Sequence, residues 1–196
     1  MNNLNETKIL LKKILDLSKI NHKNEILTYK TIKEAHIYCK INNLSGQISG
    51  PLIEYFIKNK FNMIKNNSSQ CIGDLNHNNV NFEIKVSNGG KDNKNFNYVQ
   101  LRMNHVCEYL FTAYYLDYSN IDNLGELFLF KLSKNDIKPL IIKYGGYAHG
   151  TISKLGKITQ NYLDNISNDK EYTLRPKYND DCWKELLLYR IDETTI

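Results

Sequence analysis

The chain has 196 residues, which is enough for one domain with a sizeable hydrophobic core. Hydrophobic residues make up 41% of it and prolines number only three, a composition that excludes a disordered or linker-rich chain. The formal net charge of +5 favours a polyanionic partner over an acidic protein. The four cysteines form no CxxC pair, so the sequence favours buried free thiols over a zinc site or a disulfide framework.

The N-terminal segment gives no sign of targeting to a membrane. Residues 1–13 include an acidic side chain and lack the apolar core of a signal peptide. No apolar run in the chain approaches the ~18 residues that a membrane-spanning helix needs. We therefore expect a soluble, cytoplasmic protein with no membrane partner.

Apolar spacing and capping residues predict helices in the N-terminal part of the chain. We expect these helices over residues 5–20, 31–41 and 51–60. The second begins with a capping box in which Thr31 and Glu34 serve each other's backbone amides. Pro51 suits the first turn of the third helix, so residues 44–50 are expected to form a loop.

Strands are predicted through the middle of the chain. We expect a short strand at 61–64, a hairpin of 70–75 and 80–87, and aromatic or apolar strands at 108–116 and 126–132. Further helices are expected over residues 98–105, 134–143 and 181–189. This order predicts an α/β fold in a single domain, with a mixed sheet of about five strands flanked by helices. Within the domain we expect N-terminal helices (1–49), a catalytic core (50–132) and C-terminal elements (133–196).

The hairpin register follows from its turn. Asparagine tolerates positive φ, so Asn78-Asn79 is typical of a two-residue type I′ turn, in which His77 pairs with Val80. Counting outward from that turn places Asp74 opposite Glu83. A slip of one residue would move these carboxylates to opposite faces.

In this register Asp74, Glu83 and Lys85 share one face of the hairpin, and apolar residues at 82, 84 and 86 occupy the other. Two adjacent carboxylates repel each other unless a positive charge lies between them. A divalent cation meets that requirement, and hard oxygen ligands suit Mg²⁺, with Asp74 and Glu83 as the metal ligands. Lys85 beside them is placed to hold an attacking water and to meet negative charge on a phosphate. This combination is suited to phosphodiester hydrolysis.

The pair Gly73-Asp74, followed by Glu83-Ile84-Lys85, resembles the active-site motif of the PD-(D/E)xK nuclease superfamily. In that superfamily an aspartate and an acidic-x-lysine triplet lie on adjacent strands. Gly73 stands where the family motif has a proline, a departure that leaves the carboxylate in place. Over residues 50–132 the chain looks like a small type II restriction endonuclease, which implies a restriction-endonuclease-like sheet.

The resemblance implies further roles. Glu54 lies on the helix before the sheet, where the superfamily often has an acidic residue, and would assist with a second ion or with the water. Gln100 would reach the site from the predicted helix after the motif. The implied reaction is in-line attack on a DNA phosphodiester that leaves a 5′-phosphate, with Mg²⁺ as cofactor and Mn²⁺ able to replace it. Cutting both strands of double-stranded DNA requires two active sites, so a homodimer is expected.

The loop after the hairpin and the C-terminal third are expected to contact DNA. Cations near aromatic or small polar side chains are typical of nucleic-acid surfaces. The candidate DNA-binding residues are Lys91, Lys94, Gln100, Arg102, His149, Thr151, Lys154, Lys157, Arg175 and Lys177. An ordinary polar loop is the alternative for the segment around His149.

The spacing of Asp74, Glu83 and Lys85 is a weak pattern by itself, and alternatives stay open. The hairpin charges would be a solvated face in one of them, with Glu54 at a solvated helix position. A repair or recombination nuclease of the same fold would read DNA structure instead of sequence. A DNA-binding module would carry the Glu-x-Lys triplet incidentally. A histidine-metal nuclease built on His77 and His105 has no paired ligands to support it.

Overall fold

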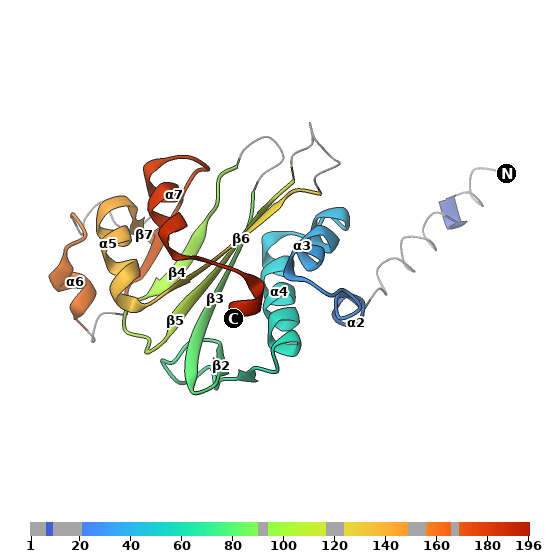
Figure 1. The fold of residues 1–196 in the computed structure, drawn as a ribbon, viewed down its shortest axis with the longest axis horizontal. Coiled ribbons are helices and arrows are strands. Elements are labelled where there is room, and N and C mark those ends of the chain that lie inside the picture. The colour runs from blue at the N-terminus through green and yellow to red at the C-terminus, as the bar shows by residue number, and fades with distance from the viewer. Residues whose placement is uncertain (1–6, 10–20, 90–93, 117–123, 149–155, 166–168) are drawn as a thin grey trace.

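The computed structural model describes residues 7–9, 21–89, 94–116, 124–148, 156–165 and 169–196 (Figure 1). Most of the helix predicted over 5–20 lies outside these ranges. So do the candidate DNA-binding residues Lys91, His149, Thr151 and Lys154. Within the described part of the chain, no helix is both long and apolar enough to cross a membrane.

The described residues form a central six-stranded sheet in the order β1-β2-β3-β5-β6-β9. Its strands are β1 (Ile64–Lys65), β2 (Leu75–His77), β3 (Val80–Asn88), β5 (Glu108–Tyr115), β6 (Glu126–Leu132) and β9 (Arg190–Ile191). The strands β3 and β5 are parallel, and all other neighbours are antiparallel. The sheet is therefore mixed, and the predicted α/β class is confirmed.

Three helices cover one face of this sheet: α2 (His22–Ile26), α3 (Ile32–Ile41) and α4 (Gly46–Lys60). The predicted capping box of Thr31 and Glu34 opens α3. The loop predicted over 44–50 is wrong for most of its length, because α4 begins at Gly46 and Pro51 lies inside it. The carbonyl of Ser45 accepts a hydrogen bond from the amide of Ser49 at 2.8 Å, so the first turn closes before the proline.

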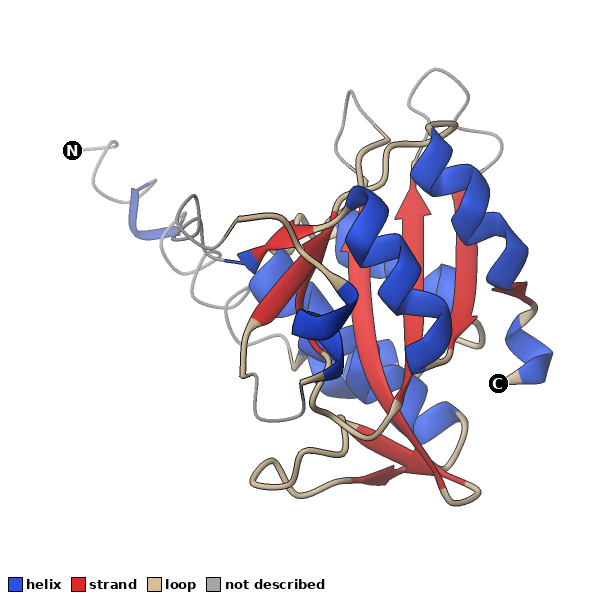
Figure 2. Ribbon diagram, turned by 90° about the vertical axis from the view of Figure 1, so that its left-hand side faces the viewer, coloured by secondary structure: helices blue, strands red, loops and turns tan. Residues whose placement is uncertain are grey.

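The other face carries a second sheet and further helices (Figure 2). The second sheet has the order β4-β8-β7. These elements are β4 (Tyr98–Arg102), β7 (Gly146–Tyr147), β8 (Glu171–Leu174), α5 (Lys134–Tyr144), α6 (Gln160–Asp164), α7 (Asp181–Leu186) and the short 3-10 helix η3 (Leu187–Tyr189). The last 3-10 helix, η4 (Glu193–Thr195), lies instead with α3 and α4, because Glu193 accepts a hydrogen bond from the Ile32 amide and pairs with Lys60. A capping box of Ser133 and Asp136 opens α5, at the start of the helix predicted over 134–143.

The helix predicted over 98–105 is wrong, since its first half is strand β4. Tyr98 and Leu101 are both buried, and their three-residue spacing resembles a helical period. The spacing comes from an irregularity in the pairing with β8, where Gln100 has a φ of 57°. The connection from β3 to its parallel neighbour β5 therefore passes through β4, where the resemblance implied a helix.

Alternating residues of β5 feed two separate cores. Tyr109, Phe111 and Ala113 join an aromatic core with residues of β4, β6, α5 and α7. Leu110 packs instead with apolar residues of α3, α4 and β3. The central sheet is thus held on both faces, which fixes the height of each β3 residue relative to α4 and to β4.

His36 joins the helix layer to the sheet. Its ring is fully buried, with Nδ1 2.7 Å from Asn88 Oδ1 and Nε2 3.0 Å from Thr112 Oγ1. An amide oxygen only accepts, so Nδ1 carries the proton and Nε2 accepts from the threonine hydroxyl. Burial lowers the pKa of His36 to about 4. The imidazole is therefore a neutral link between α3, β3 and β5.

We expect this link to make the protein acid-sensitive. The unfolded chain protonates His36 below its ordinary pKa of 6.5, while the folded protein resists protonation until about 4. The contribution of the neutral His36 ring to the free energy of unfolding is therefore fully present above pH 6.5. As the pH falls, the free energy of unfolding should decrease by about 2 kcal/mol between about pH 7 and about pH 5. Urea unfolding at the two pH values should show this loss in the wild type and in the control His77→Gln. His36→Gln should remove this part of the pH dependence of stability. An unchanged pH dependence in His36→Gln would contradict the lowered pKa assigned to His36.

Candidate functional site

The turn places Asp74 at the end of the hairpin ladder. Asn78 and Asn79 have φ values of 49° and 65°, and His77 pairs with Val80, so the predicted turn is confirmed. The predicted register holds as far as Leu75 opposite Phe82. Asp74 lies one position beyond the ladder, and the predicted pairing of Asp74 opposite Glu83 is not formed.

The chain leaves the ladder at Gly73. Its φ of 83° is a conformation that L side chains rarely adopt, and a Cβ there would lie 2.7 Å from the carbonyl oxygen of Phe82. The amide of Asp74 donates to this same carbonyl at 2.7 Å, and the amide of Ile84 donates to Asp74 Oδ2 at 2.9 Å. The aspartate side chain thus replaces the backbone acceptor that the hairpin no longer offers to β3. A proline at residue 73, with φ fixed near −65°, would not fit this bend.

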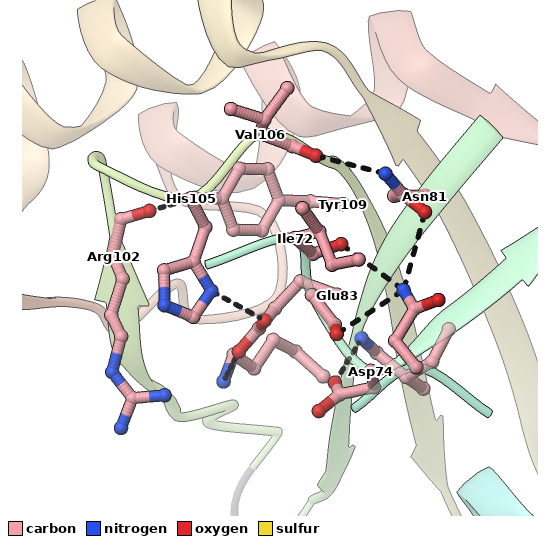
Figure 3. A network of polar contacts seen from close by, with 12 residues as sticks. Ile72, Asp74, Asn81, Glu83, Arg102, His105, Val106 and Tyr109 are labelled. Carbon is pink, nitrogen blue, oxygen red and sulfur yellow. Dashed lines mark hydrogen bonds and ion pairs between the residues drawn. The ribbon is translucent and has the colours of Figure 1, made fainter. Parts of the chain in front are cut away.

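Glu83 lies at the centre of the site with its two oxygens in different contacts (Figure 3). The residue is only 3% exposed. Lys85 Nζ lies 2.7 Å from Oε1 and His105 Nδ1 lies 3.4 Å from Oε2. A buried carboxylate needs such partners, because desolvation of an unpaired charge is costly. Lys85 is thereby held against Glu83 on the face that the sequence predicted.

Glu54 joins this group from α4. Burial raises the pKa of Glu54, and the charges of Asp74 and Glu83 raise it further, while Lys65 and Lys85 lower it. Burial likewise raises the pKa of Asp74, with Glu83 adding to the effect and the Ile84 amide opposing it. The three carboxyl groups are therefore electrostatically coupled, and bringing them together is unfavourable without a cation. Their hard oxygen donors fit the expected Mg²⁺.

The site lies on an open edge of the sheet. Among the described strands, β3 beyond Phe82 pairs with β5 on one side and has no strand neighbour on the other. A cleft of about 490 Å³ begins one residue after Lys85, and Val86, Asn88, Lys40 and Ser49 are among its lining residues. None of Glu54, Asp74, Glu83 and Lys85 lines this cleft, so the open edge of β3 is the feature that lies at the carboxylates.

The described candidate DNA-binding residues do not gather at this site. Gln100 and Lys157 are exposed, and the Arg102 guanidinium is paired with Glu171 at 2.5 Å. Lys94 Nζ lies 4.4 Å from the ring centroid of Tyr115. The other two candidates are the exposed Arg175, whose Nε donates to Asn97 Oδ1, and the exposed Lys177.

Two neighbours of Glu83 were not predicted from the sequence. His105 was considered only together with His77, and Cys107 was expected to be a buried free thiol. Ligand atoms of Glu83, His105 and Cys107 lie within 4.8 Å of one another. The parallel pairing of Phe82 with Glu108 brings them together, and no local spacing in the sequence signals that pairing. All four cysteines are free, with Cys71 exposed.

Comparison of the chain with protein-family models, with curated proteins and with solved structures finds no match.

The Asp74 carboxylate should cost stability through its charge and supply stability through its hydrogen bond. Its pKa is raised, so its favourable contribution is present at low pH and is lost as the pH rises through that pKa. Asp74→Asn keeps an acceptor for the Ile84 amide and removes the repelled charge. Its free energy of unfolding, measured with urea at neutral pH, should therefore be higher than that of the wild type by on the order of 1 kcal/mol. Asp74→Ala leaves the Ile84 amide without this acceptor and should be about 1–3 kcal/mol less stable than the asparagine variant. Equal stability of the two variants would show that the hydrogen bond is unimportant.

Replacement of Gly73 should damage the bend directly. Gly73→Ala forces a side chain into positive φ and against the Phe82 carbonyl, and the expected cost is about 1–3 kcal/mol. Gly50→Ala is the matched control, because Gly50 lies within α4 and its added Cβ would meet nothing within 4 Å apart from its chain neighbours and the nearby helix backbone. That variant should change stability by less than about 1 kcal/mol, because the gain in helix propensity is opposed by contact of the new Cβ with the following proline. Thermal unfolding of both variants measures the contrast, and a neutral Gly73→Ala would contradict the described bend.

Proposed function

We propose that this protein is a Mg²⁺-dependent endonuclease of the PD-(D/E)xK type that hydrolyses phosphodiester bonds in double-stranded DNA. The observation that supports it best is the grouping of Glu54, Asp74, Glu83 and Lys85 at an open strand edge. The carboxylates come from α4, from the break in the hairpin and from β3, so three separate elements converge there. A merely solvated hairpin face would leave Glu83 exposed, whereas it is 3% exposed.

Each residue has a role that its position supports. Asp74 and Glu83 would hold Mg²⁺, which supplies Lewis acidity and lowers the pKa of its water. Lys85, held 2.7 Å from Glu83, would donate a hydrogen bond to the nucleophilic water and offset negative charge on the phosphate. Glu54 would accept a proton or a hydrogen bond from that water. The chain's own part is to orient the water in line with the scissile bond.

The finer proposal is a sequence-specific type II enzyme acting as a homodimer. The second sheet supports it, because β4 and β8 carry exposed Gln100 and lead to exposed Arg175 and Lys177. Arg175 is already oriented by Asn97, which lies just before β4. These side chains would contact bases or phosphates while the open edge of β3 receives the scissile strand. Two copies would supply the two active sites that a double-strand cut needs.

Replacement of Lys85 tests the catalytic role. Lys85→Ala should retain DNA binding and lose cleavage by roughly 10²–10³-fold, since one electrostatic donor is removed from the reacting phosphate. Lys131→Ala is the matched control, because Lys131 also pairs with a glutamate, Glu108 at 3.4 Å, and neither residue belongs to the proposed catalytic group. The control should cleave at the wild-type rate. Plasmid cleavage with Mg²⁺ and a gel-shift assay with Ca²⁺ measure the two properties.

The pattern of plasmid products decides the class of nuclease. Discrete fragments support the restriction enzyme, and preference for branched or damaged DNA would indicate a repair or recombination nuclease instead. Binding of DNA without cutting in Mg²⁺ or Mn²⁺ would contradict the catalytic proposal and leave a DNA-binding module.

A further inference from the structure

We propose that Glu83, His105 and Cys107 form a second cation site, which binds a borderline or soft divalent metal such as Zn²⁺. The site lies beside the proposed nuclease centre and shares Glu83 with it, but it does not depend on nuclease activity. Its other ligands come from the segment that leads into β5, which the parallel pairing with β3 brings against Glu83.

The distances are close to those of a tetrahedral zinc site. Zn–N and Zn–O bonds near 2.0–2.1 Å and a Zn–S bond near 2.3 Å put neighbouring ligand atoms about 3.3–3.6 Å apart. His105 Nδ1 and Glu83 Oε2 are already 3.4 Å apart, and all three ligand atoms lie within 4.8 Å of one another. Closure of the remaining gap needs a shift of about 1 Å, which a χ1 rotation of a cysteine side chain supplies.

The His105 ring has a buried nitrogen without a hydrogen bond. Its Nδ1 lies 3.4 Å from Glu83 Oε2, but within the described part of the chain it forms no hydrogen bond with that oxygen or with any other atom. Buried polar atoms are nearly always satisfied, so an orphan among other ligand atoms indicates a missing partner. A cation at the focus of the three side chains would supply one.

The donor set selects against Mg²⁺ at this position. Thiolate and imidazole are ligands for zinc and cobalt, whereas Mg²⁺ prefers oxygen alone. The Cys107 thiol is protonated without a metal, because burial and the Glu83 charge raise its pKa to about 12. Binding forms the metal–sulfur bond as the S–H bond breaks, and the proton leaves to solvent. Cys107 also lines a surface depression of about 410 Å³ together with Asn81 and Lys134, so the thiol of the proposed site borders the protein surface.

The two carboxylate oxygens of Glu83 separate this site from the catalytic one. Oε1 faces Lys85 and Oε2 faces His105. A soft cation would therefore bind on the side of Glu83 away from Lys85, with three protein ligands and a fourth position for water. This count is typical of open zinc sites rather than closed structural ones.

Cobalt provides a direct optical test. The reduced full-length protein is titrated with Co²⁺ at neutral pH, and a near-ultraviolet sulfur-to-cobalt charge-transfer band should saturate at one equivalent and disappear on addition of Zn²⁺. Cys107→Ser should abolish the band and weaken Zn²⁺ binding, measured by competition with a chromophoric chelator, by at least roughly 100-fold. Cys71→Ser is the control, since Cys71 is exposed and lies outside the cluster, and it should keep both signals.

His105→Gln gives an independent variant if Cys107→Ser does not fold. It removes the imidazole ligand and keeps the thiol, so Co²⁺ affinity should fall while circular dichroism and thermal unfolding remain those of a folded protein. No charge-transfer band in the wild type would overturn the proposal, as would a band that Cys71→Ser removes and Cys107→Ser keeps. If the band is absent while Mg²⁺-dependent cleavage still requires Lys85, only this inference fails. A normal band with no cleavage would contradict the nuclease instead.

Discussion

The hydrogen bond from the Ile84 amide to Asp74 Oδ2 is the constraint on which the candidate site depends. A continuous hairpin would give this amide to a backbone carbonyl, and the first carboxylate would then point along an ordinary strand. Because Gly73 turns the chain away, the Asp74 side chain takes over the acceptor role. Its carboxylate is held at the amide of Ile84, the residue that follows Glu83. The same departure ends the coverage of β3 by β2, so the edge opens where the carboxylates gather. One backbone bend thus produces both the ligand arrangement and the access to it.

The surrounding structure holds together groups that repel each other. The raised pKa values of Glu54 and Asp74 show that their charged forms are disfavoured where they lie. The packing of two cores offsets this cost. The core between the helices and the sheet holds α4 in place, and the aromatic core holds β5 and the segment before it. Proteins keep such unfavourable clusters chiefly where function needs them. The cost is therefore an argument for a ligand that neutralises it, and a divalent cation is the simplest such ligand.

The sequence predicts those features whose cause is local. The Asn78-Asn79 turn sets the hairpin register, and the capping boxes at Thr31 and Ser133 mark two helix starts. Strand β4 was mistaken for a helix because the irregularity at Gln100 spaces Tyr98 and Leu101 like helical neighbours. Contacts made by parallel pairing have no local signal, which is why the meeting of His105 and Cys107 with Glu83 could not be foreseen. The Asn78-Asn79 turn predicted the common face of Asp74, Glu83 and Lys85, whereas Glu54 was expected only from a resemblance to a family motif.

Glu83 lies between two environments with opposite preferences for cations. Its acidic neighbours Asp74 and Glu54 are hard oxygen donors, which suit Mg²⁺. Its neighbours His105 and Cys107 are an imidazole and a thiol, which suit Zn²⁺. If both proposed sites bind cations, they share the Glu83 carboxylate. A cation at Oε2 would then withdraw negative charge from Oε1 and weaken its attraction for a second cation and for Lys85. Occupation of the proposed zinc site would therefore oppose occupation of the proposed magnesium site. The two metals would be coupled through a single side chain, without any change in the fold.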